Sequence, residues 1–404
     1  MTIKGGSQIT WYADGSPKEI TLAKNWKTPP GFIFKAGSVA KFHPDGIIES
    51  GIVTAKKKIS DKMVIARDTE IIWHPNGNVK KYILDNDFTT PNGIKIKGGT
   101  EIFLFDNGTY QLFTLASHWK SPSGVILKAG TEYELFENGN SKRYTLLDDW
   151  KVDKSLVIKG GTEVTFTDSG SLLNYIIAKD FTTAEGVTWK AGTTVIHYQN
   201  GNLAECTLAK EWQEEGGMVL KADAKLLFHE NGALKSGILS KDWKASNSMV
   251  WQGGRAIYLH DNGNVESLFL AANWKSPNGT TIRANTEISF YENDAPRDYT
   301  IDGDFKTSMG FIIKGGTSVV SFGNQNLAQC TLAENWLSPD GMVLKGGSRL
   351  LFHESGFPGK VTLAREWESP EGILMAAGSD ATFFSNGNVN TCTLAADIQI
   401  TYEE

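Results

Sequence analysis

Cysteine is scarce in this chain of 404 residues, which contains only three. Three cysteines are too few for the disulfide framework that stabilises small secreted domains. Cys206, Cys330 and Cys392 also share a pattern, because their separations are multiples of 31 residues. We therefore expect free thiols that act as small apolar side chains at one recurring, half-buried position.

Long apolar runs and a basic stripe are also missing. No segment approaches the roughly 20 apolar residues that span a bilayer, and the N-terminus has no apolar leader region. The 40 basic and 46 acidic residues are mixed along the chain, with a net charge of −6. We expect no transmembrane segment, no nucleic-acid partner and a cytoplasmic location. A mature secreted form is the alternative.

Catalytic motifs are absent as well. The chain has no nucleophile elbow, phosphate loop, HExxH motif or dinucleotide fingerprint. Enzymes built from repeats usually break the repeat symmetry at one place, and no part of this sequence carries a distinctive polar cluster. We therefore expect a protein that is not an enzyme and that has no cofactor, no catalytic residue and no metal site.

A β-hairpin signal is the clearest feature that is present. In residues 100–116, TEIFLFDNGTYQLFTLA, alternating apolar residues flank Asn107-Gly108. Both central residues of a two-residue hairpin turn favour positive φ, which Asn and Gly tolerate best. The segment is expected to form two antiparallel strands joined by this turn.

This turn recurs every 31 residues, in thirteen copies without insertion or deletion. The turn pairs begin at Asp14, Asp45, Asn76, Asn107, Asn138, Ser169, Asn200, Asn231, Asn262, Asn293, Asn324, Ser355 and Asn386. The repeats begin at residues 1, 32, 63, 94, 125, 156, 187, 218, 249, 280, 311, 342 and 373. Asp294 and Gln325 replace the turn glycine in the tenth and eleventh repeats, where Gln325 is the less comfortable at positive φ.

The apolar pattern within each repeat has a period of two. In the fourth repeat Ile96, Ile102 and Leu104 share one parity, while Glu101 and Phe103 have the other. The sequence predicts an all-β fold in which thirteen hairpin repeats form one twisted antiparallel sheet or superhelix, a single domain over residues 1–404. A β-solenoid with one coil per repeat is the alternative. The Lys-Gly-Gly segment before each hairpin either kinks a strand or turns the chain.

An aromatic residue follows eleven of the thirteen hairpins at one fixed position, before a Pro-x-Gly segment in several repeats, and the last repeat has Ile398 there. The position holds Trp26, Phe88, Trp119, Trp150, Phe181, Trp212, Trp243, Trp274, Phe305, Trp336 and Trp367, whereas the second repeat has Lys57. Pro fixes φ and Gly permits positive φ, which together make a stiff loop. The aromatic residues are expected to fill gaps between neighbouring hairpins. The alternative is an exposed row that binds carbohydrate or peptide, for which Trp119, Trp150, Trp212, Trp243 and Trp274 are candidates.

Histidines gather two residues before the hairpin turn, at a position that we call the ring position. His43, His74, His229, His260 and His353 occupy it, and most other repeats carry Tyr or Phe there. Two histidines in neighbouring hairpins could share a metal ion, but no ligands stand beside them at consistent spacing. A stacked ladder of rings is the favoured interpretation, and the five histidines are candidate partner-binding residues.

A lysine position forms a further column, at Lys4, Lys35, Lys97, Lys128, Lys159, Lys190, Lys221, Lys314 and Lys345, with Arg283 in register. Acidic residues stand four positions later in several repeats, and an acidic residue precedes many of the loop aromatics, as at Asp149. Alternating charge columns favour solvated ladders with weak cross-strand pairs. The alternative is a stripe that binds an anion or a partner.

The motif F-x-x-N-G-x-L, as in FHENGAL at residues 228–234, resembles bacterial MORN-type and YD-type hairpin repeats. The resemblance covers the hairpin half of each repeat, and those families have units shorter than 31 residues. It implies extended antiparallel sheets used for protein or membrane-surface contacts, or shells around another chain. No site residue carries over from it.

Two functions fit these observations. The first is a scaffold that binds a partner protein through an extended β surface, as expected for a long array with a mixed surface. The second is a glycan-binding or cell-surface adhesin module that uses exposed aromatic columns. The sequence names neither the partner nor the face that binds it.

Overall fold

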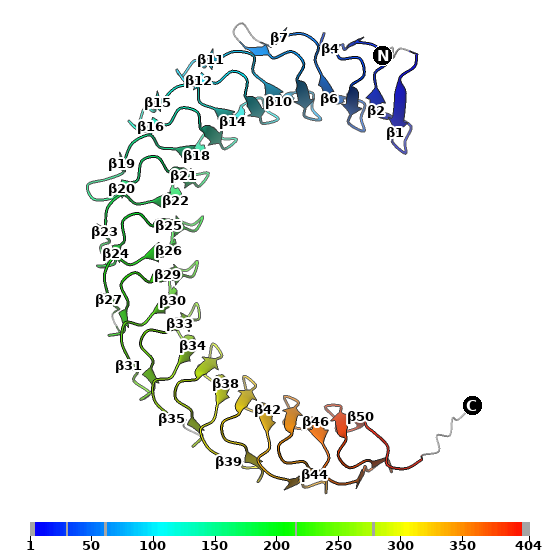
Figure 1. Ribbon diagram of the computed structural model, residues 1–404, viewed down its shortest axis with the longest axis vertical. Helices are drawn as coiled ribbons and strands as arrows, with labels where there is room; N and C mark the ends of the chain where they lie inside the picture. The colour runs from blue at the N-terminus through cyan, green and yellow to red at the C-terminus, as the bar shows by residue number, and fades with distance from the viewer. Residues whose placement is uncertain (1–4, 30, 60–62, 215, 277–278, 398–404) are drawn as a thin grey trace. The chain divides into compact units, whose positions relative to one another are not determined.

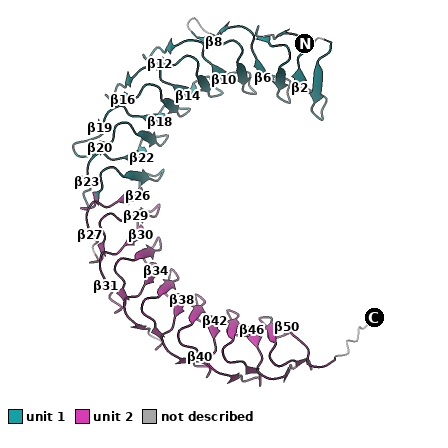
Figure 2. Cartoon of the chain, viewed as in Figure 1, with its two compact units in different colours: residues 1–185, 189–206 teal, residues 186–188, 207–404 magenta. Residues whose placement is uncertain are grey.

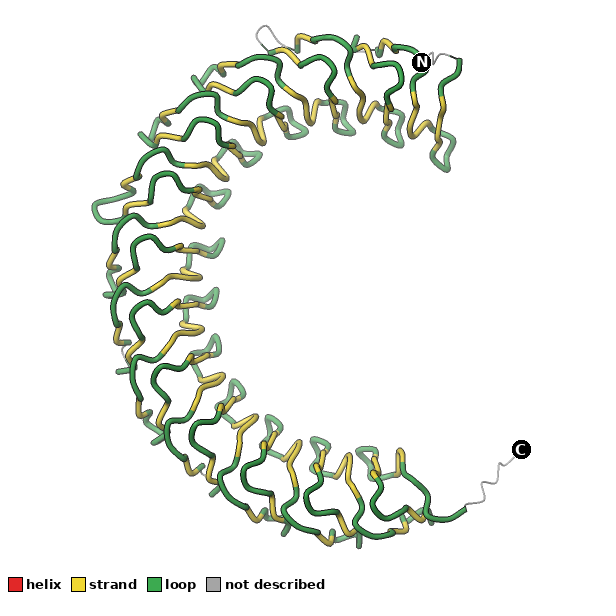
Figure 3. The backbone as a smooth tube through the Cα atoms, in the orientation of Figure 1, coloured by secondary structure: helices red, strands yellow, loops and turns green. Residues whose placement is uncertain are grey.

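A computed structural model describes residues 5–29, 31–59, 63–214, 216–276 and 279–397. The chain divides into two compact units, the first with residues 1–185 and 189–206 and the second with residues 186–188 and 207–404 (Figure 2). Each unit is built from the same two parts, a long hairpin and a short strand pair, which alternate along the chain (Figure 3).

Long hairpins form the sheet of the first unit, pairing in chain order with all pairs antiparallel. Their turns lie on one side of the unit (Figure 1). The strands are β1 (Gln8–Trp11), β2 (Pro17–Thr21), β5 (Val39–Phe42), β6 (Ile48–Ile52), β9 (Glu70–Trp73), β10 (Val79–Ile83), β13 (Glu101–Leu104), β14 (Tyr110–Thr114), β17 (Glu132–Leu135), β18 (Ser141–Thr145), β21 (Glu163–Phe166), β22 (Leu172–Ile176), β25 (Thr194–His197) and β26 (Leu203–Thr207).

The second unit repeats the arrangement with antiparallel neighbours throughout. Its long-hairpin strands are β29 (Lys225–Phe228), β30 (Leu234–Ile238), β33 (Ala256–Leu259), β34 (Val265–Phe269), β37 (Glu287–Phe290), β38 (Pro296–Thr300), β41 (Ser318–Ser321), β42 (Leu327–Thr331), β45 (Arg349–Phe352), β46 (Pro358–Thr362), β49 (Asp380–Phe383) and β50 (Val389–Thr391).

Short strands follow each long hairpin and line the side of each unit opposite the long turns (Figure 1). A short pair joins the loop aromatic of one repeat to the apolar triplet that opens the next, as Trp119 pairs with Leu127. The strands are β3 (Trp26–Lys27), β4 (Ile33–Phe34), β7 (Lys57–Lys58), β8 (Val64–Ile65), β11 (Phe88–Thr89), β12 (Lys95–Ile96), β15 (Trp119–Lys120), β16 (Ile126–Leu127), β19 (Trp150–Lys151), β20 (Val157–Ile158), β23 (Phe181–Thr182), β24 (Thr188–Trp189), β27 (Trp212–Gln213), β28 (Val219–Leu220), β31 (Trp243–Lys244), β32 (Val250–Trp251), β35 (Trp274–Lys275), β36 (Thr281–Ile282), β39 (Phe305–Lys306), β40 (Ile312–Ile313), β43 (Trp336–Leu337), β44 (Val343–Leu344), β47 (Trp367–Glu368) and β48 (Leu374–Met375).

These pairings confirm the all-β repeat fold expected from the sequence. The described residues contain no helix. Neighbouring strands run antiparallel within each unit, whereas stacked coils of a solenoid would pair in parallel, so the hairpin sheet is the arrangement present. The expectation of a single domain over residues 1–404 stays a prediction.

The core of each repeat lies between its long hairpin and its short pair. In the fourth repeat Ile96, Ile102, Phe113 and Leu115 are all buried. Ile96 also pairs with Leu115 through an isolated β-bridge, and the same bridge recurs in other repeats, as between Leu344 and Leu363. Because strand side chains alternate between faces, the other parity faces solvent.

The hairpin turn differs from its predicted form. Only the glycine has positive φ, as at Gly108 with φ of 84°, and Asn107 does not share this conformation. Gly108 N–H donates to the carbonyl of Phe105, and Phe105 N–H donates to the carbonyl of Thr109. This pattern is a type I turn followed by a glycine bulge, so the loop has three residues instead of two.

The Pro-x-Gly loop closes the short pair with the same turn geometry. Gly124 N–H donates to the carbonyl of Ser121, Ser121 N–H donates to the carbonyl of Val125, and Gly124 has φ of 88°. The Lys-Gly-Gly segment turns the chain instead of kinking a strand, because Gly99 with φ of 74° lies between β12 and β13. The fourth repeat therefore uses one turn design twice.

Candidate functional site

The ring position links each hairpin to the next one. The Nε2 atoms of His229 and His353 lie 2.8 Å from the carbonyl oxygens of Leu259 and Phe383, thirty residues ahead. His43, His74 and His260 make the same contact at 3.0 to 3.2 Å. A carbonyl oxygen only accepts, so Nε2 carries the proton in all five rings. The tyrosine hydroxyls of Tyr12 and Tyr291 donate to equivalent carbonyls.

These contacts give the histidine column a structural role within each unit. The five rings are half-buried, and the proton that each holds on Nε2 is engaged with the backbone of the neighbouring hairpin. Among the residues that the structure describes, no group of three or more His, Cys, Asp or Glu side chains is placed to hold a metal ion. Partner binding by these histidines stays a prediction.

The turn asparagines form a second link beside the ring position. Asn138 Nδ2 donates to the carbonyl of Asp168, and Asn231 Nδ2 donates to the carbonyl of Asp261, again thirty residues ahead. The Oδ1 atom of Asn138 accepts from the N–H of Asn140 in its own turn. Asparagine is therefore favoured here for two hydrogen bonds, whereas the sequence analysis explained it by φ alone.

The five candidate tryptophans of the loop column lie half-buried on the short strands. Trp119 contacts the ring of Tyr133 at 6.1 Å between centroids, and Trp150 contacts Phe166 at 6.4 Å. Trp212 pairs with Leu220 across its short strands, and Trp243 meets Trp251 edge-on at 4.6 Å. Each indole thus packs one side on the core while part of it reaches solvent.

Trp274 shows how the indole nitrogen is used. Its Nε1 donates to the carbonyl of Asn247 in the preceding loop at 3.2 Å, as Trp367 does to Asp340 at 3.1 Å. The tryptophan therefore ties two neighbouring loops together. The loop tryptophans thus fill gaps between neighbouring hairpins, as expected, and remain partly exposed. Carbohydrate or peptide binding by this column stays a prediction.

In most of the described repeats the residue before the loop aromatic accepts a hydrogen bond from the backbone. Asp149 Oδ1 accepts the N–H of Gly160, and Asn335 Oδ1 accepts that of Gly346, both at 2.8 Å. His118 Nδ1 accepts the N–H of Ala129 at 3.0 Å, which fixes the proton on Nε2 if the ring is neutral. These side chains hold the Lys-Gly-Gly turn of the following repeat.

Charged residues concentrate on the solvent face of the sheet at Arg143. Its guanidinium contacts the carboxylates of Glu132, Glu134 and Glu163 at 2.9, 3.0 and 3.1 Å. Burial raises the pKa of Glu134, but hydrogen bonds from Lys142 and Arg143 outweigh burial and hold it below its ordinary value. In the lysine column, Lys35 pairs with Asp68, both half exposed, and Lys4 lies outside the described residues.

A row of cross-strand neighbours runs over the solvent face, with one side chain per strand; we call it the cross-strand row. In the first unit it comprises Thr10, Glu19, Lys41, Ser50, Ile72, Lys81, Phe103, Leu112, Glu134, Arg143, Thr165, Asn174, Ile196 and Glu205. In the second unit it comprises Leu227, Ser236, Tyr258, Ser267, Ser289, Asp298, Val320, Gln329, Leu351, Lys360, Thr382 and Thr391.

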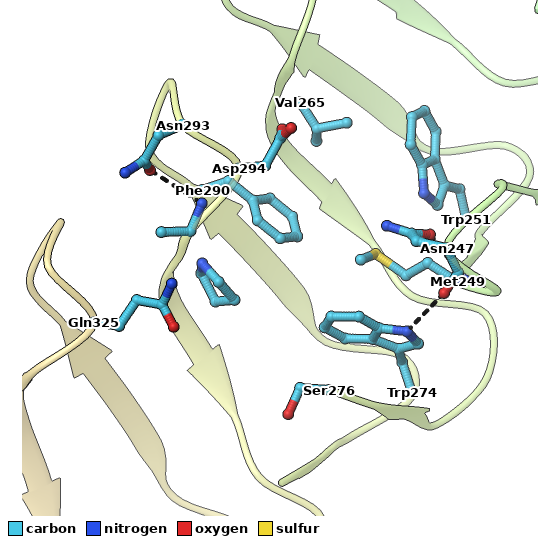
Figure 4. Close-up of a pocket in the computed structure, with 12 residues that line it drawn as sticks. Asn247, Met249, Trp251, Val265, Trp274, Ser276, Phe290, Asn293, Asp294 and Gln325 are labelled. Atoms are coloured by element: carbon cyan, nitrogen blue, oxygen red, sulfur yellow. Dashed lines mark hydrogen bonds between the residues drawn. The ribbon is translucent and has the colours of Figure 1, made fainter. Parts of the chain in front are cut away.

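Grooves lie between the loop tryptophans and the turns of the following hairpins in the second unit. One of about 470 Å³ is lined by Trp274, Phe290 and the turn at Asn293 (Figure 4). Another of about 630 Å³ is lined by Trp367, Phe383 and the turn at Asn386. These grooves do not follow from the sequence pattern, because they arise from packing between a loop and the next repeat. The recurring loop aromatic residues are the feature of the sequence that could have indicated the grooves.

The cysteines and one further histidine are structural. The three thiols are free, as expected, and burial raises the pKa of Cys206 and of Cys330 to about 12. His197 in β25 accepts the hydroxyl hydrogen of Tyr175 on Nε2 and donates from Nδ1 to the carbonyl of Gly201. Burial lowers the pKa of His197, and the Gly201 hydrogen bond opposes only part of that shift.

No protein-family model and no curated protein matches this chain. Solved structures resemble it at low similarity. The TcdB2-TccC3-TEV structure has 8% identity and a TM-score of 0.13, covering 96% of this chain and 24% of that one, so the chain spans about a quarter of its length. The TCP10 domain of Danio rerio CPAP, in complex with a STIL peptide, has 14% identity and a TM-score of 0.15, covering 76% and 98%.

The modular autolysin LytC from Streptococcus pneumoniae has 10% identity and a TM-score of 0.14, covering 75% of this chain and 52% of that one. These scores are too low for any of the three likenesses to carry an argument about function. What the pairings within each unit establish is a tandem β-hairpin repeat protein.

Proposed function

We propose that this protein is a non-enzymatic scaffold that binds a partner protein through the solvent face of its long hairpins. The observation that carries the proposal is the cross-strand row. In the first unit, half-buried Ile72, Phe103 and Leu112 alternate along it with charged Lys81 and Glu134. Mixed apolar and charged patches of this kind are typical of non-obligate protein interfaces.

The length of the row also supports a protein ligand. Successive strands lie about 4.8 Å apart, so the fourteen strands of the first unit present a row on the order of 60 Å long. A standard interface involves about 20–30 residues per partner, so the fourteen side chains of the row would form the centre of such an interface. The ion pair between Arg143 and Glu134 holds these two side chains of the row in place, which lowers the entropy that binding must fix.

The proposal includes membership of a MORN-like or YD-like class of hairpin repeats and a cytoplasmic location. The repeated Asn-Gly hairpin supports the first, and three free thiols are compatible with the second. The described residues contain no helix of the length and apolar character needed to cross a membrane. Glycan binding by the tryptophan column is the second candidate function, favoured by the grooves beside Trp274 and Trp367.

Affinity capture with matched variants tests the partner surface. The full chain is used as bait beside Phe103→Asp with Leu112→Asp, which place charges in the apolar part of the row, and Lys154→Glu, an exposed change outside the row. We expect a partner that the parent and Lys154→Glu retain and the row variant loses. A partner retained equally by all three baits, or no retained protein, contradicts the proposal. Circular dichroism of each bait confirms that it is folded.

A further inference from the structure

The groove beside Trp274 has the composition of a small-molecule site. Its volume is about 470 Å³, within the range of roughly 300–1,000 Å³ usual for ligand pockets. The apolar wall consists of Met249, Trp251, Val265, Trp274, Phe290 and Pro296. The polar lining includes Asn247, Asn293, Asp294 and Gln325, and the lining as a whole comes from four successive repeats (Figure 4).

Trp251 brings an unpartnered donor to this groove. The residue is 7% exposed, and among the described residues its Nε1 has no hydrogen-bond acceptor. Figure 4 shows the nitrogen on the edge of the ring that faces Asn247 and Met249. The nitrogen exposes less than 1 Å² to solvent, so a ligand acceptor reaches it when the neighbouring Asn247 or Met249 side chain moves aside. Such an acceptor would satisfy a buried N–H that otherwise has no partner. Elsewhere in the second unit the equivalent position is aliphatic, as at Ile282 and Leu344.

Two hairpin turns break the repeat pattern at the same place. The φ > 0 position of the turn is glycine in the other eleven repeats, but here it holds Asp294 with φ of 62° and Gln325 with φ of 67°. Both side chains are exposed and line the groove. The adjacent loop also departs from glycine, since Ser248 has φ of 67°. These residues place hydrogen-bonding side chains where a glycine would leave open space.

We propose that this groove is a binding site for a neutral carbohydrate, one or two sugar residues in size. Of its twelve lining residues none is basic and one is a carboxylate, which disfavours anionic ligands. A sugar ring has an apolar face that packs on Trp274 and Phe290. Its hydroxyl groups accept from the Trp251 N–H and the amides of Asn293 and Gln325, and they donate to Asp294.

This site is separate from the cross-strand row, and it gives the glycan-binding candidate one location and one ligand class. It does not depend on the partner-protein proposal. The two fail in different measurements, because capture of a protein by the row makes no use of sugar binding in the groove.

The test is saturation-transfer NMR with the full chain and the probes cellobiose, lactose and diacetylchitobiose, followed by titration calorimetry of any that bind. Gln325→Gly and Asp294→Gly restore the residue that the other repeats carry, so loss of folding does not explain a negative result. Trp251→Phe keeps an aromatic ring and removes the N–H. Asn107→Gly changes a turn in the first unit and serves as the control.

We expect at least one probe to bind with millimolar affinity or better. Affinity is expected to fall about tenfold or more in Trp251→Phe and in the double variant Asp294→Gly with Gln325→Gly, while Asn107→Gly binds as the parent does. Failure of all three sugars to show saturation transfer overturns the proposal. It is equally overturned if the variants bind a sugar unchanged, or if only a peptide probe with basic side chains binds.

Discussion

At the ring position, different side chains meet one backbone acceptor. His229 donates from Nε2 to Leu259 and Tyr291 donates from its hydroxyl to Ser321, with the same offset of thirty residues. Phe105 and Phe136 occupy the position without a donor. The ring therefore supplies packing in most repeats and a hydrogen bond in those where it is His or Tyr.

His229→Phe is expected to destabilise the second unit by about 1 kcal/mol, because the carbonyl of Leu259 loses a donor while the ring volume is kept. His229→Tyr restores a donor and is expected to fall within about 0.5 kcal/mol of the parent. Urea unfolding followed by circular dichroism measures both. If the two variants share one midpoint, the hydrogen bond contributes nothing.

Gln325→Gly is expected to raise stability. A non-glycine residue at φ of 67° costs about 1 kcal/mol, and the substitution removes this cost. Part of the resulting gain in stability is lost because glycine has more conformational freedom in the unfolded chain. Asp294→Gly should gain less, because Asp tolerates this conformation better than Gln. Thermal unfolding provides the comparison, and Gly263→Gln, the reverse change in the ninth repeat, should lower the midpoint.

His197 gives the first unit a pH dependence. Its folded pKa lies below the ordinary value of about 6.5, so as pH falls below that value the unfolded chain binds a proton that the folded chain resists. Stability is therefore expected to fall between pH 7 and pH 5. His197→Phe, which carries the residue found at the equivalent Phe166 and Phe228, should show a flatter profile over this range. Urea titrations at each pH give the free energy of unfolding. If it changes with pH equally in the parent and in His197→Phe, His197 is not the cause.

At the scale of the element, the long hairpin was predictable and its details were not. Alternating Ile102, Phe103 and Leu104 around Asn107-Gly108 indicate strands and faces directly, because a period of two is a local property. The bulged form of the turn depends on hydrogen bonds between Phe105 and Thr109 and was missed. The groove at Trp251 was missed because its walls come from four repeats, and periodicity does not report packing between them.

Where an Asp or Asn precedes the loop aromatic, its side-chain oxygen fixes the Lys-Gly-Gly turn to the preceding repeat. Asp304→Ala is expected to lower the unfolding midpoint, because the N–H of Gly315 loses the Oδ1 acceptor at 2.7 Å. Asp304→Asn should behave as the parent, since Asn273 and Asn335 accept the same bond in neighbouring repeats. Differential scanning calorimetry of the three proteins tests this. An unchanged unfolding midpoint for Asp304→Ala would mean that backbone contacts alone hold the turn in place.

At the scale of the whole molecule, the constant 31-residue spacing predicts that repeats are interchangeable. Removing residues 94–124, one full repeat, places Val125 after Gly93, a junction equivalent to the native Gly124–Val125. Nearest-neighbour contacts should re-form, so the shortened chain is expected to fold cooperatively. Removing residues 94–117 instead breaks the period and should leave a protease-sensitive chain. Limited proteolysis with circular dichroism distinguishes the two shortened chains. If both are cleaved at similar rates, the hypothesis that each repeat is stabilised by its nearest neighbours is contradicted.

The ring and asparagine links all run in one direction, because each hairpin is the donor and the hairpin thirty residues ahead is the acceptor. During synthesis from the N-terminus, a finished hairpin that carries a His, Tyr or Asn donor thus waits for the next hairpin to leave the ribosome before that donor is satisfied. Assembly of each unit is therefore vectorial. Unpaired donors of these links therefore occur only on the most recently synthesised hairpin.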